Sequence, residues 1–268
     1  MYRNILVHLD HSKHCAARID VACKLALDFD AHLTGLYAID ATQGIGPEPL
    51  ANPSTMLERM GLVQPEPERI GGLFEARAER AGVTRREFRR ALGDAPKNVA
   101  FHARYSDLVI LGQGDPDEQL TGVTPVFPQS VVLAAGAPVL VVPYYTDTFR
   151  ALGQRVVIAW DGGREAARAV KDALPFLVRA RDVYTLSIAA KPDKQDVASP
   201  SIDLAAYLAH HGVRSEAART FTGELAIGDT LLARMFDYEA DLVVMGAYGH
   251  SRLRELVLGG VTQSMLNH

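Results

Sequence analysis

The chain has 268 residues, of which 48% are hydrophobic and 22% are charged, and its formal net charge is −4. This length and composition are typical of a globular protein with one large or two medium domains. The mildly acidic balance gives no electrostatic reason to expect nucleic acid as a partner, because phosphate backbones are held mainly by clustered Lys and Arg.

Cysteine usage and hydropathy indicate the compartment. Cys15 and Cys23 form neither a CxxC motif nor a disulfide framework, which suits a reducing cytosol. The apolar run at the N-terminus, Ile5 to Val7, is too short for a signal peptide. No segment approaches the ~18 unbroken apolar residues of a spanning helix. We therefore expect a soluble, cytoplasmic protein without a membrane partner.

Two segments of the first half recur, in the same order, in the second half. NILVHLD at residues 4–10 is echoed 151 residues later by RVVIAWD, and DLVILG at 107–112 is echoed 134 residues later by DLVVMG. Matched landmarks in one order indicate a duplication. The unequal offsets place extra residues in the middle of the first copy. Residues 41–67, which are rich in Gly and Pro, are the predicted insertion, with a short helix near 55–60.

Strands and helices are predicted to alternate along both copies. Dense apolar runs indicate strands covered on both faces, and apolar residues at helical spacing indicate the helices between them. In the first copy, the predicted strands are 4–9, 33–39, 86–91, 108–111 and 138–142, and the helices are 11–29, 66–81, 96–105 and 128–135. In the second copy, the predicted strands are 155–160, 182–189, 215–220 and 242–245, and the helices are 163–177, 199–210, 229–239 and 261–266.

This alternation implies parallel sheets with right-handed crossovers. We predict an α/β protein of two tandem, doubly wound, Rossmann-like domains, at residues 1–145 and 155–268. The second copy has no counterpart of strand 138–142 in this chain, so either the chain is cut short or this domain lacks its fifth strand. An exposed sheet edge is a liability, and we expect the other domain or a second molecule to cover it.

Glycines follow strand 242–245 in a pattern that suits phosphate binding. Gly246 ends the strand, Gly249 follows, and Gly259 and Gly260 lead into the last predicted helix. Glycine lets the backbone come close to a ligand, and the unpaired N–H groups at a helix start attract anions. The alternative is that these glycines serve only the turns.

This pattern, Gly246-x2-Gly249-x9-Gly259 followed by a small residue, resembles the nucleotide-binding signature of the universal stress protein family. The family normally has Ser or Thr where this chain has Gly260, so one hydroxyl for phosphate is missing, whereas Val261 and Thr262 fit the pattern. The resemblance covers nearly the whole chain, in two copies.

The resemblance implies a site for ATP, ADP or AMP, with or without Mg, in the second domain. Asp161 would meet the adenine or ribose edge, although it could instead cap the helix that follows. Ile188 would lie beside adenine, or it could be ordinary core. Thr262 would donate its hydroxyl to phosphate, or bond within its helix. The predicted nucleotide-binding residues are Ala159, Trp160, Asp161, Ile188, Met245, Gly246, Gly249, Gly259, Gly260, Val261 and Thr262.

The first copy departs from the signature. Three carboxylates, Asp115, Asp117 and Glu118, lie where phosphate would sit, and no glycine pair opens the helix at 128–135. Repulsion between like charges disfavours triphosphate there, so we predict a structural or degenerate first copy.

Metal and catalytic motifs are not predicted. His8, His11 and His14 follow a regular spacing, but they span a strand and a helix start, which does not place three rings on one face, and zinc needs three or four converging ligands. We therefore predict no structural metal. No GxSxG, HExxH or Walker sequence occurs.

The predicted function is a nucleotide-binding regulator of the stress response that hydrolyses ATP slowly or not at all. The resemblance also implies a homodimer, or pairing of the two domains within one chain, through sheet edges. One alternative is a scaffold or interaction protein whose nucleotide site has decayed. Another is a nucleotide-using enzyme, which only the analogy of related folds supports.

Overall fold

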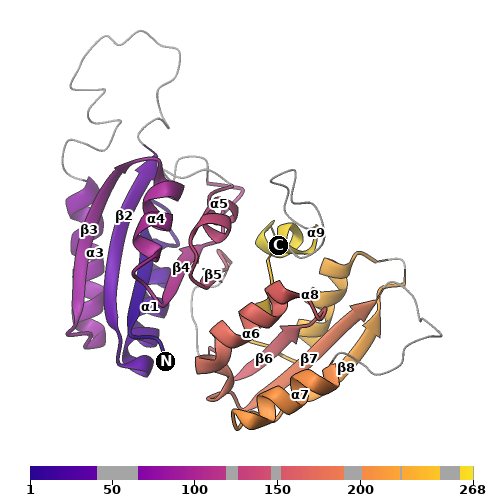
Figure 1. The fold of residues 1–268 in the computed structure, drawn as a ribbon. Helices are drawn as coiled ribbons and strands as arrows, with labels where there is room; N and C mark the ends of the chain where they lie inside the picture. The colour runs from indigo at the N-terminus through magenta and orange to yellow at the C-terminus, as the bar shows by residue number, and fades with distance from the viewer. Residues whose placement is uncertain are drawn as a thin grey trace. The chain divides into compact units, whose positions relative to one another are not determined.

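The computed structural model describes residues 1–40, 66–118, 126–145, 152–189, 201–223, 225–247 and 260–267. The chain divides into two compact units, Met1–Thr148 and Phe149–His268, which are described one at a time (Figure 1). Most of the predicted insertion at 41–67, including its short helix, lies outside the described residues.

The first unit is a five-stranded parallel sheet in the order β3-β2-β1-β4-β5. This order is that of a doubly wound sheet, as predicted. Its strands are β1 (Asn4–Leu9), β2 (His32–Asp40), β3 (Arg86–Gly93), β4 (Leu108–Gly112) and β5 (Val139–Val142). Its helices are α1 (Cys15–Phe29), α3 (Glu66–Ala81), α4 (Ala95–Ala103) and α5 (Phe127–Ala134).

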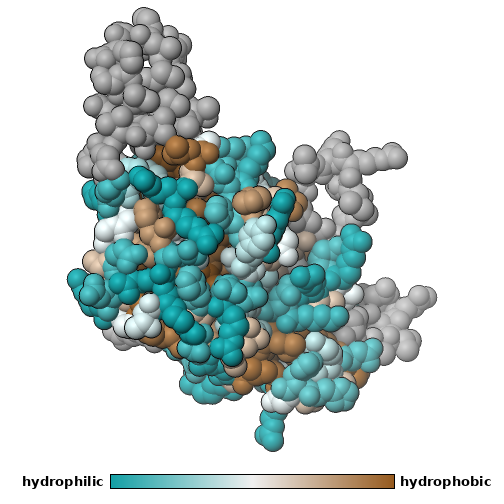
Figure 2. Space-filling model, turned by 60° about the vertical axis from the view of Figure 1, so that its left-hand side comes forward, coloured by the Kyte–Doolittle hydropathy of each residue, from teal (hydrophilic) through white to brown (hydrophobic). Residues whose placement is uncertain are grey.

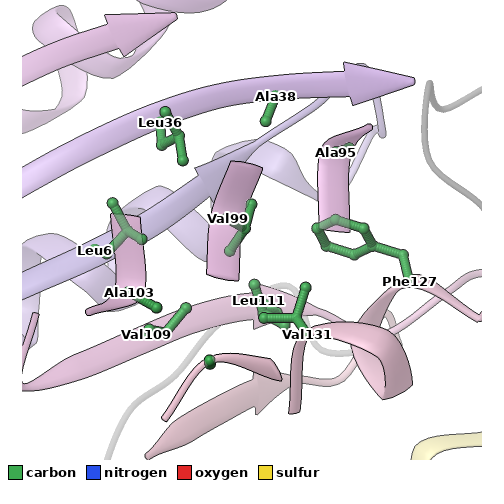
Figure 3. Packing of buried hydrophobic residues seen from close by; sticks show 11 residues of the cluster. Leu6, Leu36, Ala38, Ala95, Val99, Ala103, Val109, Leu111, Phe127 and Val131 are labelled. Atoms are coloured by element: carbon green, nitrogen blue, oxygen red, sulfur yellow. The ribbon is translucent and has the colours of Figure 1, made fainter. Parts of the chain in front are cut away.

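An apolar cluster joins the sheet of the first unit to α4 and α5. Figure 3 shows side chains of β1, β2 and β4 facing those of the two helices. Asp94 begins α4 by accepting a hydrogen bond from the Lys97 backbone N–H at 2.9 Å, which fixes the helix start. The buried members are Leu6, Leu36, Ala38, Ala95, Val99, Ala103, Val109, Leu111, Phe127, Val131 and Ala135.

The second unit repeats this order in a four-stranded parallel sheet, β8-β7-β6-β9. Among its described residues no strand pairs with the outer side of β9, which agrees with the predicted loss of the last strand. Its strands are β6 (Arg155–Ala159), β7 (Asp182–Ala189), β8 (Glu216–Phe221) and β9 (Leu242–Met245). Its helices are α6 (Arg164–Leu177), α7 (Ser201–His210), α8 (Ile227–Asp237) and α9 (Gly260–Asn267).

The first helix begins later than predicted. A helix was expected from residue 11, but α1 begins at Cys15 because residues 12–14 form a turn in which the Cys15 N–H donates to the Ser12 carbonyl at 3.1 Å. The Asp10 carboxylate accepts from the Ser12 N–H at 3.0 Å and holds that turn in place. The turn keeps His11 and His14 off the regular helix.

The surface is mainly hydrophilic on the face shown in Figure 2, where apolar residues lie in separate patches among polar ones. Within the described parts of the chain, no helix combines the length and the hydropathy needed to cross a bilayer.

Candidate nucleotide site and its counterpart in the first unit

The ends of β6 and β9 lie side by side in the second unit. Ala159 and Met245 are partners in the register of these two strands, and the chain continues from them into Trp160 and Gly246. Strands β7 and β9 lie on opposite sides of β6, so the strand order reverses here, and ligands of doubly wound sheets bind outside the carboxyl ends of the strands at such a point. The structure thus brings together the predicted residues from both strand ends.

Asp161 lies at the start of α6 without being its cap. Gly163 is the N-cap residue, and the exposed Asp161 carboxylate accepts a hydrogen bond from the Gly163 N–H at 2.8 Å. The alternative that Asp161 itself caps the helix is therefore wrong by position, although its carboxylate orients the capping residue. The neighbouring strand is held by Ser187, whose hydroxyl donates to the Trp160 carbonyl at 3.0 Å.

Gly246 has a packing role. A Cβ atom there would lie 2.5 Å from the Ala166 backbone nitrogen and 2.7 Å from the Glu165 carbonyl carbon, so only glycine lets the end of β9 pack against the first turn of α6. Gly260 differs, because a Cβ atom there would meet no atom within 4 Å. Gly249 and Gly259 lie outside the described residues.

The remaining predicted residues belong to the apolar interior near the strand ends. Ala159, Ile188 and Val261 pack against a buried cluster that contains Leu186, and Thr262 on α9 is buried. The alternative reading of Ile188 as core therefore has direct structural support. Its proposed position beside adenine is compatible with that packing, because Ile188 is only partly buried.

In the first unit, a buried side chain rather than the helix backbone packs against the equivalent glycine. A Cβ atom on Gly112, at the end of β4, would overlap Nη1 of Arg18. Arg18 is buried on α1, its Nη2 lies 2.8 Å from Asp10 Oδ1, and its Nε donates to the His8 carbonyl at 2.8 Å. By the 151-residue offset, Asp10 corresponds to Asp161 and Arg18 to Ala169. The second unit therefore has no arginine at this position of its first helix.

Asp10 stays ionised although it is buried. Burial disfavours the ionised form of Asp10, but the charge of Arg18, with further help from His8 and Ser12, outweighs burial and lowers the pKa of Asp10 to about 2. Burial, partly opposed by Asp10 and reinforced by Arg18, lowers the pKa of His8 to about 4. The neutral His8 ring donates from Nε2 to the Ala38 carbonyl at 2.7 Å.

Sequence reasoning did not single out Arg18. It lies on the same helical face as Cys15 and Ala22, both of which are buried. A charged residue on an apolar stripe is the signal that could have identified it.

A pH dependence of stability follows from His8. The unfolded chain protonates this ring near pH 6.5 and the folded chain only near pH 4, so its contribution is complete above pH 6.5 and is lost as the pH falls toward 4. We expect about 2 kcal/mol of unfolding free energy to be lost between pH 7 and pH 5 through this group. Urea titrations followed by far-UV circular dichroism measure it.

The variant His8→Gln, which keeps a donor for the Ala38 carbonyl, should flatten this dependence, whereas His210→Gln at the exposed end of α7 should not. The contribution of Asp10 does not interfere, since it is lost only below about pH 3.8, as the pH falls toward 2. An equally steep profile in His8→Gln would contradict the assignment.

Comparisons with known proteins follow the division into two copies. The model of the universal stress protein family matches residues 1–143 and 153–268. A universal stress protein from Archaeoglobus fulgidus DSM 4304 is 17% identical, with a TM-score of 0.73 over 98% of this chain and 94% of that one, and shows the fold. A search of curated proteins gave no match.

Two shorter solved structures match about half of the chain. A member of the same family from Burkholderia pseudomallei is 25% identical, with a TM-score of 0.40 over 53% of this chain and 96% of that one. A universal stress protein from Archaeoglobus fulgidus in complex with dAMP is 14% identical, with a TM-score of 0.36 over 52% of this chain and 97% of that one.

Proposed function

This chain belongs to the universal stress protein family, and we propose that its second unit binds an adenine nucleotide (ATP, ADP or AMP) at the carboxyl ends of β6 and β9. The observation that carries the proposal is the contrast between the units. At the corresponding strand ends, Arg18 pairs with the buried Asp10 in the first unit, whereas the second unit has Ala169 in place of the arginine and an exposed carboxylate, Asp161.

In this proposal, residues at the strand ends and at the start of α9 contact different parts of the nucleotide. Asp161 accepts hydrogen bonds from the ribose hydroxyls or the adenine amino group, since an ionised carboxylate only accepts. Ile188 and Val261 offer apolar surface to the base. The phosphates approach Gly260 and the unpaired N–H groups of the first turn of α9, where anions are favoured.

We further propose a regulatory rather than a catalytic role. The second unit has no identified general base and no lysine clamp of the Walker type, so hydrolysis of ATP is expected to be slow or absent. Nucleotide would act as a switch only by stabilising one state of the protein over another. An exposed edge at β9 leaves room for strand pairing with another sheet, within the chain or in a homodimer.

The variant Asp161→Asn tests the role of the carboxylate. Asparagine keeps an oxygen that accepts from the Gly163 N–H, so the fold should be retained. It replaces the second carboxylate oxygen with an amide donor, which cannot accept a hydrogen bond from the ligand. We expect affinity for ATP to fall by roughly tenfold or more, the loss of one hydrogen bond to a charged group. Isothermal titration calorimetry with the intact chain measures this.

The matched control is Asp203→Asn, which removes an exposed carboxylate on α7 and should leave affinity unchanged. Equal affinity in Asp161→Asn and the native chain would place the ribose elsewhere. A native chain that carries no nucleotide and ignores added ATP would favour the scaffold alternative, for which the missing hydroxyl at Gly260 is an argument.

A further inference from the structure

The loop after β4 of the first unit brings carboxylates to a histidine. Among the described residues, His14, Asp115 and Glu118 form a group whose ligand atoms all lie within 4.8 Å of one another. His14 belongs to the turn before α1, and the two carboxylates belong to the segment that follows Gly112. The histidine is at least 101 positions from either carboxylate in sequence, and the parallel pairing of β1 with β4 makes them neighbours.

The three histidines near the N-terminus separate, as the sequence spacing predicts. His8 Nε2 bonds the Ala38 carbonyl, and His11 Nε2 lies 2.6 Å from the Tyr37 hydroxyl. Only His14 turns toward the β4 loop, where its Nε2 lies 2.9 Å from Asp115 Oδ2. The three rings therefore have different partners, and only His14 lies beside the two carboxylates.

The two carboxylates are held in position, and one oxygen of Glu118 has no hydrogen-bond partner among the described residues. The Asp115 side chain is only 4% exposed, and its Oδ1 accepts from the Asp117 N–H at 2.9 Å. Glu118 Oε1 accepts from the Lys13 N–H at 3.0 Å. Glu118 Oε2 is shielded from solvent and has no hydrogen-bond partner. A buried, unpartnered carboxylate oxygen is costly unless a cation lies beside it.

Lys13 supplies part of that positive charge from the surface. Its ammonium lies 2.8 Å from Asp115 Oδ2, and its side chain is 59% exposed. An exposed ammonium exchanges at little cost, because surface ion pairs contribute little to stability. A small dication could displace it.

We propose that the first unit has a Zn²⁺-type divalent cation site formed by His14, Asp115 and Glu118. This site lies at the carboxyl end of the first unit's own sheet, and the equivalent end of the other sheet is the proposed phosphate site of the second unit. One imidazole nitrogen and two carboxylate oxygens suit Zn²⁺, which binds such ligands at about 2.0–2.2 Å and accepts water as a fourth. The backbone bond from Asp117 acts as the outer contact that orients Asp115. The site is independent of the proposed nucleotide binding.

The test is titration of the intact chain with Zn²⁺, and separately with Mg²⁺, by calorimetry after treatment with a chelator. We expect one Zn²⁺ per chain, with much weaker binding of Mg²⁺, since an imidazole ligand favours Zn²⁺. The variants His14→Gln and Glu118→Gln should each weaken binding by roughly tenfold or more, as loss of a ligand requires.

Two further variants separate a metal site from an ordinary hydrogen-bonded loop. Asp117→Asn alters the exposed third carboxylate of the same loop, outside the ligand group, and should change affinity less than about threefold. Lys13→Met removes the competing ammonium and should tighten Zn²⁺ binding by about three- to tenfold. Circular dichroism confirms that each variant is folded.

The proposal is overturned if the native chain and Lys13→Met both fail to bind Zn²⁺ at micromolar concentrations. It is also overturned if Asp117→Asn weakens binding as much as Glu118→Gln does, because the ion would then be held by diffuse acidic charge. A stoichiometry of one that is lost in both ligand variants and kept in Asp117→Asn would support it.

Discussion

Gly260→Val is expected to lower the affinity of the chain for ATP by roughly 30-fold, the equivalent of ~2 kcal/mol of hydrogen bonds to phosphate. In the proposed site, the phosphates approach the first turn of α9, and a branched side chain at its first residue would hold them away from the N–H groups. A Cβ atom at position 260 meets no atom of the described residues within 4 Å, so we expect the substitution to leave their packing intact. Calorimetric titration with ATP measures the change.

The companion variant Gly260→Ser restores the hydroxyl that the family normally has at this position. It should retain or improve affinity, because the added oxygen can donate to phosphate and its Cβ has the same open space. Gly112→Val is not a suitable control in the first unit, since its Cβ would displace the buried Arg18. If Gly260→Val bound ATP as tightly as the native chain, phosphate would not lie at α9.

Arg18→Ala is expected to destabilise the first unit by about 3–5 kcal/mol, the usual cost of removing one partner from a buried ion pair. The substitution leaves the Asp10 carboxylate buried without its countercharge, and leaves the His8 carbonyl without the Nε donor. Urea unfolding followed by far-UV circular dichroism measures the loss. The single tryptophan, Trp160, lies in the second unit, so its fluorescence reports on that unit separately.

A matched control is available on the corresponding helix of the second unit. Arg168 forms an exposed ion pair with Asp172, and Arg168→Ala should cost no more than about 0.5 kcal/mol. We predict that Arg18→Ala lowers the urea midpoint of the transition seen by circular dichroism more than that of the transition seen by tryptophan fluorescence. A loss below ~1 kcal/mol in Arg18→Ala would mean that the ion pair adds little to the first unit.

The fold was predictable because its signals are local and repeated. Helix α3 and strands β7 and β9 begin and end at the predicted residues, and the four strands among the described residues of the second unit are the four that its sequence predicts. The later start of α1 was missed because it depends on the Asp10 carboxylate, which holds a turn that helical spacing does not reveal.

The candidate site was predictable in outline only. The resemblance located the strand ends at Asp161 and Gly246, and the register of β6 with β9 places them at one edge of the sheet. Three features depend on contacts between distant segments. These are the packing of Gly246 against α6, the position of Arg18 against Gly112 and the approach of His14 to Glu118. Such contacts follow from the tertiary structure and leave no periodic pattern in the sequence.

The proposal that the second unit alone binds an adenine nucleotide is tested most directly by the number of nucleotides that one chain holds. The intact protein is denatured, the released nucleotide is identified by mass spectrometry, and calorimetric titration of the emptied chain gives the stoichiometry. We predict one nucleotide per chain, because Asp10 is buried and paired with Arg18 in the first unit, whereas the corresponding Asp161 of the second unit is exposed. Two per chain would contradict a first unit without a site, and none, with no response to added ATP, would contradict the proposed function.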